Sequence, residues 1–187
     1  MTEDLLKKAI NKELTEEEAI GLTTQFPFLI DEPSNEFEEK VMDAWDISNW
    51  IDEVPRGWLK AFGYDFFTEL IEALHKDQCF NEFEFIQIKE KFGQLRIYAS
   101  NYGDATREVL SKYEELSKYY CIHCGKLATQ ISEGWICPWC DDCTEQIHSK
   151  MIPITEAYEM TQEEIDQEIE HIKTSYKYED YWKRLGG

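Results

Sequence analysis

The chain has 187 residues, of which 42% are hydrophobic and 14% aromatic, and its formal charge at pH 7 is −20. This composition predicts a folded chain with one sizeable core. No apolar stretch approaches the roughly 18 to 20 residues of a membrane helix, and the charged N-terminus lacks the apolar segment of a signal peptide. We therefore expect a cytoplasmic protein with no membrane partner. The acidity is spread along the chain and disfavours direct binding to nucleic acid. It serves either solubility or attraction to a basic protein surface.

The first third of the chain predicts helices interrupted by a loop. Residues 2–12 predict a short helix, and Thr15 with Glu18 has the form of a capping box that opens a second one. Residues 26–35 contain two prolines and predict a loop, and a further helix is expected over about 35–44. A bulky apolar segment follows, which forms either core or interface: Trp45, Ile47, Trp50, Ile51, Val54 and Trp58.

The next segment predicts a helix and then a hairpin. Asp65 is expected to cap a helix that runs to about Lys76 and buries one apolar face. From residue 82 to residue 100 the period changes to about two, which is typical of a β-hairpin. Ile86 and Ile88 are expected on the same face, before a turn at Phe92 and Gly93.

A basic face on this hairpin stands out in so acidic a chain. If the turn contains two residues, Lys89 lies opposite Arg96 and Lys91 lies opposite Gln94, so like charges meet across the strands. This face is either an anion or partner site or a surface that the chain's own carboxylates neutralise. Its members are Gln87, Lys89, Lys91, Gln94, Arg96 and Tyr98.

Two helices flank the cysteine-rich segment: one over about 104–120, and a long one opened by a capping box at Thr161 and Glu164. We predict an α+β fold, with helices packed on a small antiparallel hairpin or sheet and a zinc knuckle before the long C-terminal helix. The chain then divides into an acidic helical segment (1–55), a helix-hairpin-helix core (56–120), the zinc knuckle (121–148) and the C-terminal helix (149–187). Together they are expected to form one compact domain.

Four cysteines have the spacing of a zinc site. Cys121 and Cys124 form one C-x-x-C pair, and Cys140 and Cys143 form another after 15 intervening residues. Two residues between ligands allow a tight turn in which both thiolates reach the same ion, and Gly125 suits a turn that needs positive φ. Four thiolates complete a closed tetrahedron around Zn²⁺, which indicates a structural rather than a catalytic metal.

The remaining cysteines and histidines of this region leave alternatives open. Cys137 forms a C-P-W-C motif with Cys140, which resembles a redox dithiol but lacks the βαβ unit that such motifs open. Cys137 can instead replace a ligand, face solvent or lie in the core. Cys79 is expected to be a free thiol near a helix end. A closed site of four cysteines needs neither His123 nor His148, so both are expected at the surface.

The order of these motifs resembles a widespread family of bacterial and phage proteins. "IKEKFGQLRIYAS", a helix, "CxxCG", "GW" and "CDxC" are similar to the family's K-E-K-F-G-G-L-R-F-Y signature and zinc knuckle. The upstream Gly57-Trp58-Leu59 also matches, and the resemblance covers about residues 56–146. It implies that the third and fourth ligands are Cys140 and Cys143, and that Cys137 lies where no cysteine is needed. Gln94 replaces the usual second glycine. The resemblance implies no particular reaction or partner.

No phosphate-binding loop, nucleophile elbow or H-E-x-x-H motif is present. The leading hypothesis is a non-enzymatic, zinc-stabilised acidic protein, encoded by a phage or prophage, that binds a basic protein surface as an inhibitor or DNA mimic. The alternative is an enzyme or anion-binding protein whose Lys89, Lys91 and Arg96 bind an anion, with a site between the hairpin and residues 45–58. Nucleic-acid binding through the knuckle is disfavoured, because residues 119–150 contain more acids than lysines.

Overall fold

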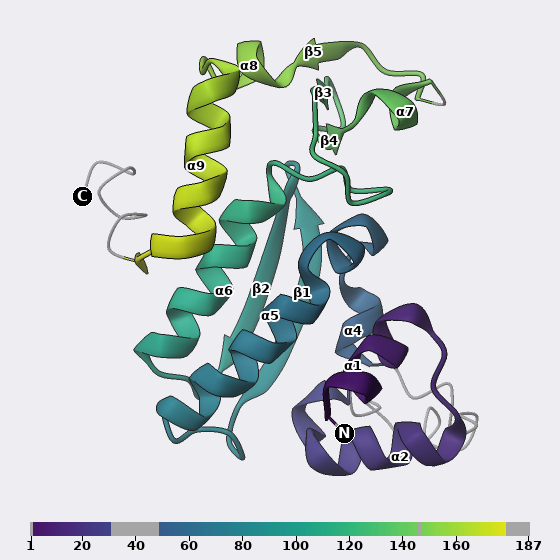
Figure 1. Ribbon diagram of the computed structural model, residues 1–187, viewed down its shortest axis with the longest axis vertical. Helices are drawn as coiled ribbons and strands as arrows, with labels where there is room; N and C mark the ends of the chain where they lie inside the picture. The colour runs from purple at the N-terminus through teal and green to yellow at the C-terminus, as the bar shows by residue number, and fades with distance from the viewer. Residues whose placement is uncertain (1, 31–48, 146, 179–187) are drawn as a thin grey trace.

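A computed structural model describes residues 2–30, 49–145 and 147–178 (Figure 1). The fold is α+β, as predicted, with a cluster of cysteines before the C-terminal helix. The helix expected over about 35–44 lies outside the described residues, as do Trp45 and Ile47. Among the helices that the structure describes, none combines the length and the apolar character that crossing a membrane requires.

The elements follow one another in a simple order. The N-terminal part consists of α1 (Thr2–Asn11), α2 (Glu16–Gln25), the 3₁₀ helix η1 (Pro27–Leu29) and α4 (Trp50–Glu53). The central part consists of α5 (Arg56–Lys76), β1 (Glu84–Lys91), β2 (Gln94–Ser100) and α6 (Asp104–Ser117). The C-terminal part consists of β3 (Gln130–Ser132), β4 (Pro138–Trp139), α7 (Asp141–Thr144), β5 (Met151–Pro153), α8 (Ile154–Ala157) and α9 (Gln162–Ser175).

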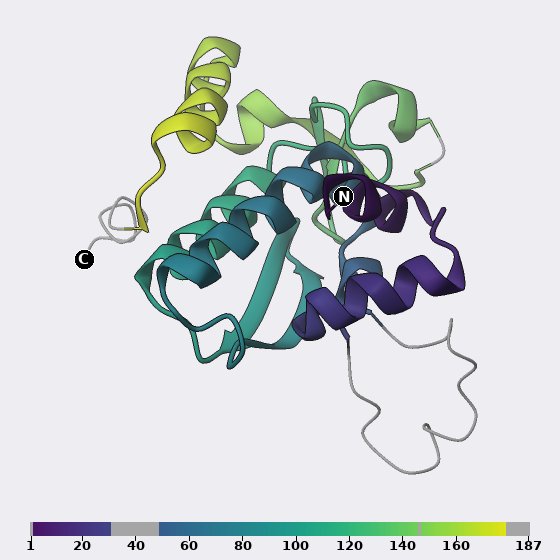
Figure 2. The same cartoon turned by 60° about the horizontal axis from the view of Figure 1, so that its bottom comes forward.

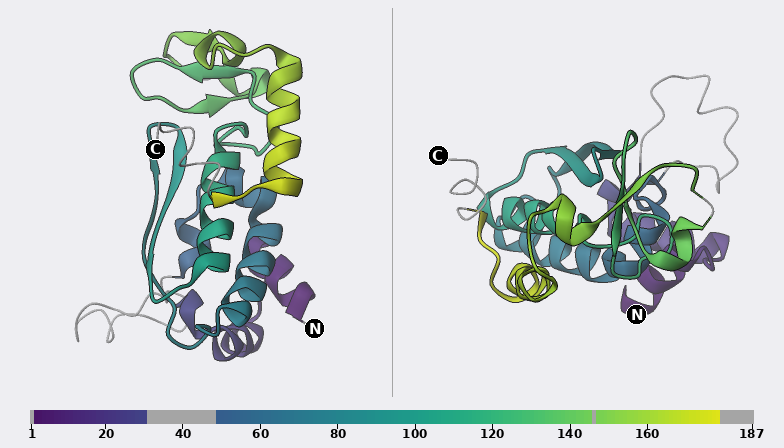
Figure 3. Two further views of the ribbon diagram at one scale, coloured as in Figure 1. Left: turned by 90° about the vertical axis from the view of Figure 1, so that its left-hand side faces the viewer. Right: turned by 90° about the horizontal axis from the view of Figure 1, so that it is seen from above.

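The central part is a layer of two helices on a two-stranded hairpin. α5 and α6 lie side by side and cover one face of the β1–β2 hairpin, while α9 packs along α6 (Figures 1 and 3). α1 packs against α4 and α5, and α2 packs on α1 and η1 (Figure 2). The short strands β3, β4 and β5 form a separate antiparallel sheet in the order β4-β3-β5 at one end of the helices. We call residues 121–153, which contain this sheet, the ribbon.

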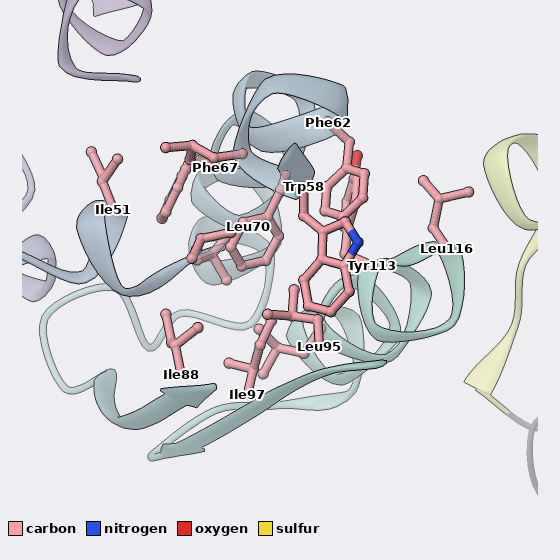
Figure 4. Close-up of a cluster of buried hydrophobic side chains, with 14 of the residues drawn as sticks. Ile51, Trp58, Phe62, Phe67, Leu70, Ile88, Leu95, Ile97, Tyr113 and Leu116 are labelled. Carbon is pink, nitrogen blue, oxygen red and sulfur yellow. The ribbon is translucent and has the colours of Figure 1, made fainter. Parts of the chain in front are cut away.

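The core lies between α5, α6 and the hairpin (Figure 4). Trp58, Phe66 and Phe67 of α5 are completely buried, and Leu95 of β2 meets them from the hairpin. The buried residues form one cluster that extends from Leu6 to Tyr176.

α5 begins ten residues earlier than predicted. Asp65 lies in the middle of this helix and does not cap it, because the helix starts at Arg56, directly after Pro55. Gly57 and Gly63 lower the local helix propensity and make the sequence favour a later start. Burial of the bulky side chains between them overrides that preference, as tertiary packing commonly does.

The hairpin has the predicted turn. Phe92 and Gly93 have φ values of +54° and +77°, as a type I′ turn requires, and Lys89 lies opposite Arg96. The expectation that Ile86 and Ile88 share a face is wrong. A β-bulge between Phe85 and Gln87 turns Ile86 outward, so that it is 62% exposed while Ile88 is 3% exposed.

The outer edge of β2 is occupied by side chains of α6. The amide of Leu95 donates to Ser117 Oγ (2.8 Å), and the amide of Ile97 donates to Glu114 Oε1 (2.6 Å). Burial raises the pKa of Glu114 to about 7, although the Ile97 amide and Arg96 oppose this shift. Helix and strand are therefore joined by polar contacts as well as by apolar packing.

Candidate metal centre

The four predicted ligand cysteines come together from two turns of the ribbon. Cys121 and Cys124 lie in the turn that follows α6, Cys140 follows β4, and Cys143 lies in α7. Their Sγ atoms all lie within 4.8 Å of one another. A Zn²⁺ ion with four thiolates at about 2.3 Å has sulfur–sulfur distances of about 3.8 Å, so the cluster matches a tetrahedral site after small shifts of the side chains.

The separation of the sulfurs also identifies the four cysteines as thiols. All four are free cysteines, and the 3.4 Å between Cys124 Sγ and Cys140 Sγ is far longer than a disulfide bond of about 2.05 Å. Cys121 and Cys140 are buried, whereas Cys124 and Cys143 are partly exposed. An ion at this position would lie near the surface, with two ligands toward the core.

Backbone hydrogen bonds shape both turns. The amide of Gly125 donates to the carbonyl of Cys121 (2.9 Å), and Gly125 has the predicted positive φ, at +82°. In the second turn, the amide of Cys143 donates to the carbonyl of Cys140 (3.0 Å). The two-residue spacing therefore produces two tight turns whose thiols converge, as the sequence predicts.

The thiols of the cluster influence one another's pKa values. Burial and hydrogen bonds to Cys124 and Cys140 raise the pKa of Cys143, and burial with a hydrogen bond to Cys124 raises the pKa of Cys140. Burial also opposes ionisation of Cys124, but hydrogen bonds from the Lys126 amide and the neighbouring thiols lower its pKa. Several thiolates so close together need a bound cation, and a divalent metal supplies one.

His123 lies closer to the cluster than expected. Its side chain is exposed, as predicted, but its Nδ1 lies 3.4 Å from Cys143 Sγ. A catalytic dyad would require a lowered thiol pKa, whereas the pKa of Cys143 is raised. The arrangement fits a histidine that donates its N–H to a metal-bound sulfur. His148 is exposed, as predicted.

Cys137 belongs to the core, one of the alternatives that the sequence leaves open. It is 2% exposed and is not among the clustered cysteines. Burial, with a smaller contribution from Glu90, raises the pKa of Cys137 to about 12. A redox dithiol needs a reactive thiolate, so this thiol is unsuited to that role. Cys79 is a free thiol directly after the end of α5, as predicted.

Hydrogen bonds and close backbone packing hold the ribbon and the preceding Tyr120 against the start of α5. The amide of Gly57 donates to the carbonyl of Ile122 (2.9 Å), and Trp58 Nε1 donates to the carbonyl of Tyr120 (2.8 Å). A Cβ atom at Gly57 would lie 2.2 Å from the carbonyl oxygen of Cys121, and one at Gly125 would lie 2.5 Å from the carbonyl oxygen of Gly57. Gly57 and Trp58 therefore help to position the turn that contains Cys121 and Cys124. The spacing of residues in the sequence does not reveal this contact.

The predicted basic face of the hairpin forms, with one change. Lys89, Lys91 and Arg96 lie on the face turned away from α5, but Gln94 is 8% exposed and donates to Glu115 (2.9 Å). The Arg96 guanidinium lies 3.9 Å from Glu114. Within the described parts of the chain, neither Lys89 nor Lys91 forms an ion pair; Lys89 donates to Gln87 instead.

The alternative site between this face and residues 45–58 does not form in the described part of that segment. Trp50 packs on Phe85 with ring centroids 5.6 Å apart, and Trp58 faces Leu95 and Ile97 of the hairpin (Figure 4). Both tryptophans therefore pack on the buried face of the hairpin, whereas Lys89 and Arg96 lie on the opposite face. An anion bound by Lys89 and Arg96 would therefore lie on the open outer face of the hairpin.

Comparison of the chain with protein-family models, with curated proteins and with solved structures finds no match in any of the three. The resemblance to the bacterial and phage family therefore stays a prediction, and the geometry of the cysteine cluster carries the functional argument.

Proposed function

We propose that this chain is a non-enzymatic protein that binds another protein, and that a structural Zn²⁺ ion held by Cys121, Cys124, Cys140 and Cys143 stabilises it. The cysteine cluster is the observation that carries the proposal. Four thiolates fill the coordination sphere of Zn²⁺ and leave no position for a reacting water, which favours a structural role over hydrolysis.

The ribbon has little else to stabilise it. Its strands contain three, two and three residues, and sheets of such short strands are marginal in water. Its buried apolar side chains are few, with Ala128 and Ile131 among them. A metal that ties the two turns together would contribute much of the folding free energy of this part.

The acidic surface supports a protein partner with a basic surface. α9 buries Ile165, Ile169 and Ile172 and exposes Glu163, Asp166 and Glu170 on its outer side. In the part of the chain that the structure describes, these three carboxylates form no ion pair; Glu163 and Asp166 accept hydrogen bonds from glutamines. Unneutralised carboxylates along an outer helix attract a basic surface and speed its association. DNA mimicry is the sharper form of this proposal.

The zinc proposal is tested by native mass spectrometry of single variants. We expect one zinc per chain in the wild type, loss of zinc in Cys121→Ser and Cys140→Ser, and retention in the matched controls Cys79→Ser and Cys137→Ala. Retention of zinc by either ligand variant, or its loss from both controls, would overturn the ligand assignment.

The partner proposal is tested by affinity capture at 50 and 500 mM NaCl, with and without duplex DNA as a competitor. We expect captured proteins to be basic, to be released by salt, and to be reduced several-fold by Glu163→Gln/Asp166→Asn/Glu170→Gln. DNA mimicry further requires that duplex DNA displaces them. Capture that persists in high salt, or that the triple variant leaves unchanged, would contradict the acidic-surface mechanism.

A further inference from the structure

The tip of the β1–β2 hairpin meets the tip of the β3–β4 loop. A Cβ atom at Gly93 would lie 3.2 Å from the carbonyl oxygen of Ile136 and 3.5 Å from Cys137 Cα. In Figure 3 (left), the hairpin turn points at the ribbon. Two turns more than 40 residues apart in the sequence thus form one surface.

The residues beside this contact are apolar and exposed. Phe92 is 75% exposed and Trp135 is 74% exposed, the two highest values among the large hydrophobic side chains of the described residues. Ile136 is 43% exposed. We call Phe92, Trp135 and Ile136 the tip patch. Phe92 precedes Gly93 and Trp135 precedes Ile136, so this backbone contact brings two exposed aromatic residues onto adjoining turns. Exposed aromatic side chains are typical of protein interfaces.

Phe92 adopts a conformation that does not suit its side chain. Its φ of +54° lies in the left-handed region, which bulky residues rarely adopt, and the first position of a type I′ turn favours Asn. The exposed ring adds little to the core in return. A residue that opposes local preference without adding to packing indicates a role outside the fold.

Trp135 is presented by a rigid turn. The buried hydroxyl of Ser132 accepts hydrogen bonds from the Cys137 amide (3.0 Å) and from Trp139 Nε1 (3.1 Å), and it donates to the Trp135 carbonyl. One side chain thus ties three residues of the loop together. Preorganisation of this kind lowers the entropy cost of binding.

Basic side chains lie beside the tip patch. Lys91 Nζ lies 5.6 Å from the centre of the Phe92 ring, and Lys89 Nζ lies 5.2 Å from the centre of the Tyr98 ring. Other lysines, such as Lys112 with Glu69, pair with carboxylates. Lys89 and Lys91 form no such pair with any described residue, even though the chain carries 39 acidic side chains. Lys89 and Lys91 therefore place positive charge beside the tip patch of a protein that is otherwise acidic.

We propose that the tip patch, with Lys89 and Lys91, is a docking surface for an acidic protein segment with an aromatic or aliphatic anchor. The anchor would pack on Phe92 and Trp135, and its carboxylates would pair with the two lysines. Pairing as an added strand is disfavoured at β2, because Ser117 and Glu114 occupy the outward amides there. The proposal goes beyond the proposed function, since this surface differs in place and charge from the outer side of α9.

A protein segment fits better than a nucleic acid. Two lysines neutralise about two phosphates, which releases few counterions, and the net charge of −20 repels a long polyanion. A segment with a few carboxylates meets less repulsion and also gains from burial of its apolar anchor. The observations therefore favour side-chain capture of a protein.

The test is selection of binders from a displayed library of random 12-residue peptides against the zinc-loaded full chain. We expect the selected peptides to combine at least two acidic residues with an aromatic or aliphatic residue. A synthetic copy of the best peptide should bind at least tenfold more weakly to Phe92→Asn or Trp135→Ala, and several-fold more weakly to Lys89→Ala/Lys91→Ala. Ile20→Asn, a matched exchange of an exposed apolar residue on α2, should leave the affinity unchanged.

Phe92→Asn also separates binding from folding, because Asn-Gly is a preferred type I′ pair and the melting temperature should stay the same or rise. Absence of selected peptides, peptides without acidic residues, or equal binding to Phe92→Asn would overturn the proposal. Two further results would overturn it in favour of another occupant. One is binding of a fluorescent 15-nucleotide oligo-dT that Phe92→Asn abolishes. The other is self-association of the wild type in analytical ultracentrifugation that Phe92→Asn abolishes.

Discussion

Gly57→Ala tests how the ribbon is joined to the helical core. The added Cβ would lie 2.2 Å from the Cys121 carbonyl oxygen and 2.4 Å from the Ile122 carbonyl carbon, whereas ordinary contact begins at 3.4 Å. The turn that contains Cys121 must therefore retreat by about 1.2 Å. That movement also stretches the hydrogen bond from the Gly57 amide to Ile122.

The expected magnitude follows from three contributions. Overpacking against backbone costs about 1–3 kcal/mol, and the strained hydrogen bond costs about 1 kcal/mol. The better helix propensity of alanine returns about 1 kcal/mol. We expect Gly57→Ala to lower the free energy of unfolding by about 2 kcal/mol overall, and to release zinc faster to a chromogenic chelator.

Gly21→Ala is the matched control, because Gly21 also lies in a helix but has nothing within 4 Å of the added Cβ. It should be neutral or stabilising by up to about 1 kcal/mol. Urea unfolding followed by circular dichroism measures both variants. If Gly57→Ala were as stable as Gly21→Ala, the close backbone contact between α5 and the ribbon would be wrong.

Three further changes test the polar contacts that join the elements. Glu114 has a raised pKa of about 7, against an ordinary 4.5, so between pH 4.5 and pH 7 this side chain binds a proton in the folded chain but not in the unfolded chain. The free energy of unfolding therefore falls by about 3 kcal/mol as the pH rises from 4.5 to 7. Glu114→Gln should remove that fall, and parallel urea midpoints of variant and wild type at pH 5 and pH 8 would contradict it. The Asp77 carboxylate accepts the amides of Ala105 and Thr106 at the start of α6 and keeps a lowered pKa despite burial. Asp77→Ala should cost about 0.5–2 kcal/mol at pH 7, and its difference from wild type should shrink below pH 3.8, in urea titrations at both pH values. Trp58→Phe leaves the Tyr120 carbonyl without its indole donor and should cost about 1–3 kcal/mol in the same assay, whereas an unchanged midpoint would show that this bond contributes little.

The features that the sequence predicts correctly depend on neighbouring residues. The capping boxes at Thr15 and Thr161 form as expected, because cap and partner lie three positions apart. The register of the hairpin follows from its two-residue turn, and the approach of the four cysteines follows from their spacing. The caps, the hairpin turn and each C-x-x-C turn depend on residues a few positions apart, so local rules suffice for them. The approach of the two C-x-x-C turns, 16 residues apart at Cys124 and Cys140, is predicted because four thiols at this spacing suit one ion.

The features that the sequence does not predict depend on contacts between distant segments. From the sequence, Gly57 only lowers the helix propensity of its segment. Its close contact with the Cys121 carbonyl explains why a glycine is needed there. The outward turn of Ile86 comes from a bulge that alternation does not reveal. Similarly, the sequence places Lys89 and Lys91 on a basic face but does not tell whether carboxylates neutralise them. Among the described residues, neither lysine forms an ion pair, and this depends on where the fold places the carboxylates of distant segments.

The side chains of α6 on the edge of β2 have a consequence for how this protein behaves at high concentration. A bare strand edge offers its amides to any extended segment that approaches, which templates growth into fibrils. Ser117 and Glu114 already bind the outward amides of Leu95 and Ile97, so a foreign strand must first break two hydrogen bonds, one of them buried. A protein with so short a sheet can therefore display hydrophobic residues at the hairpin tip while its neighbouring strand stays closed to aggregation.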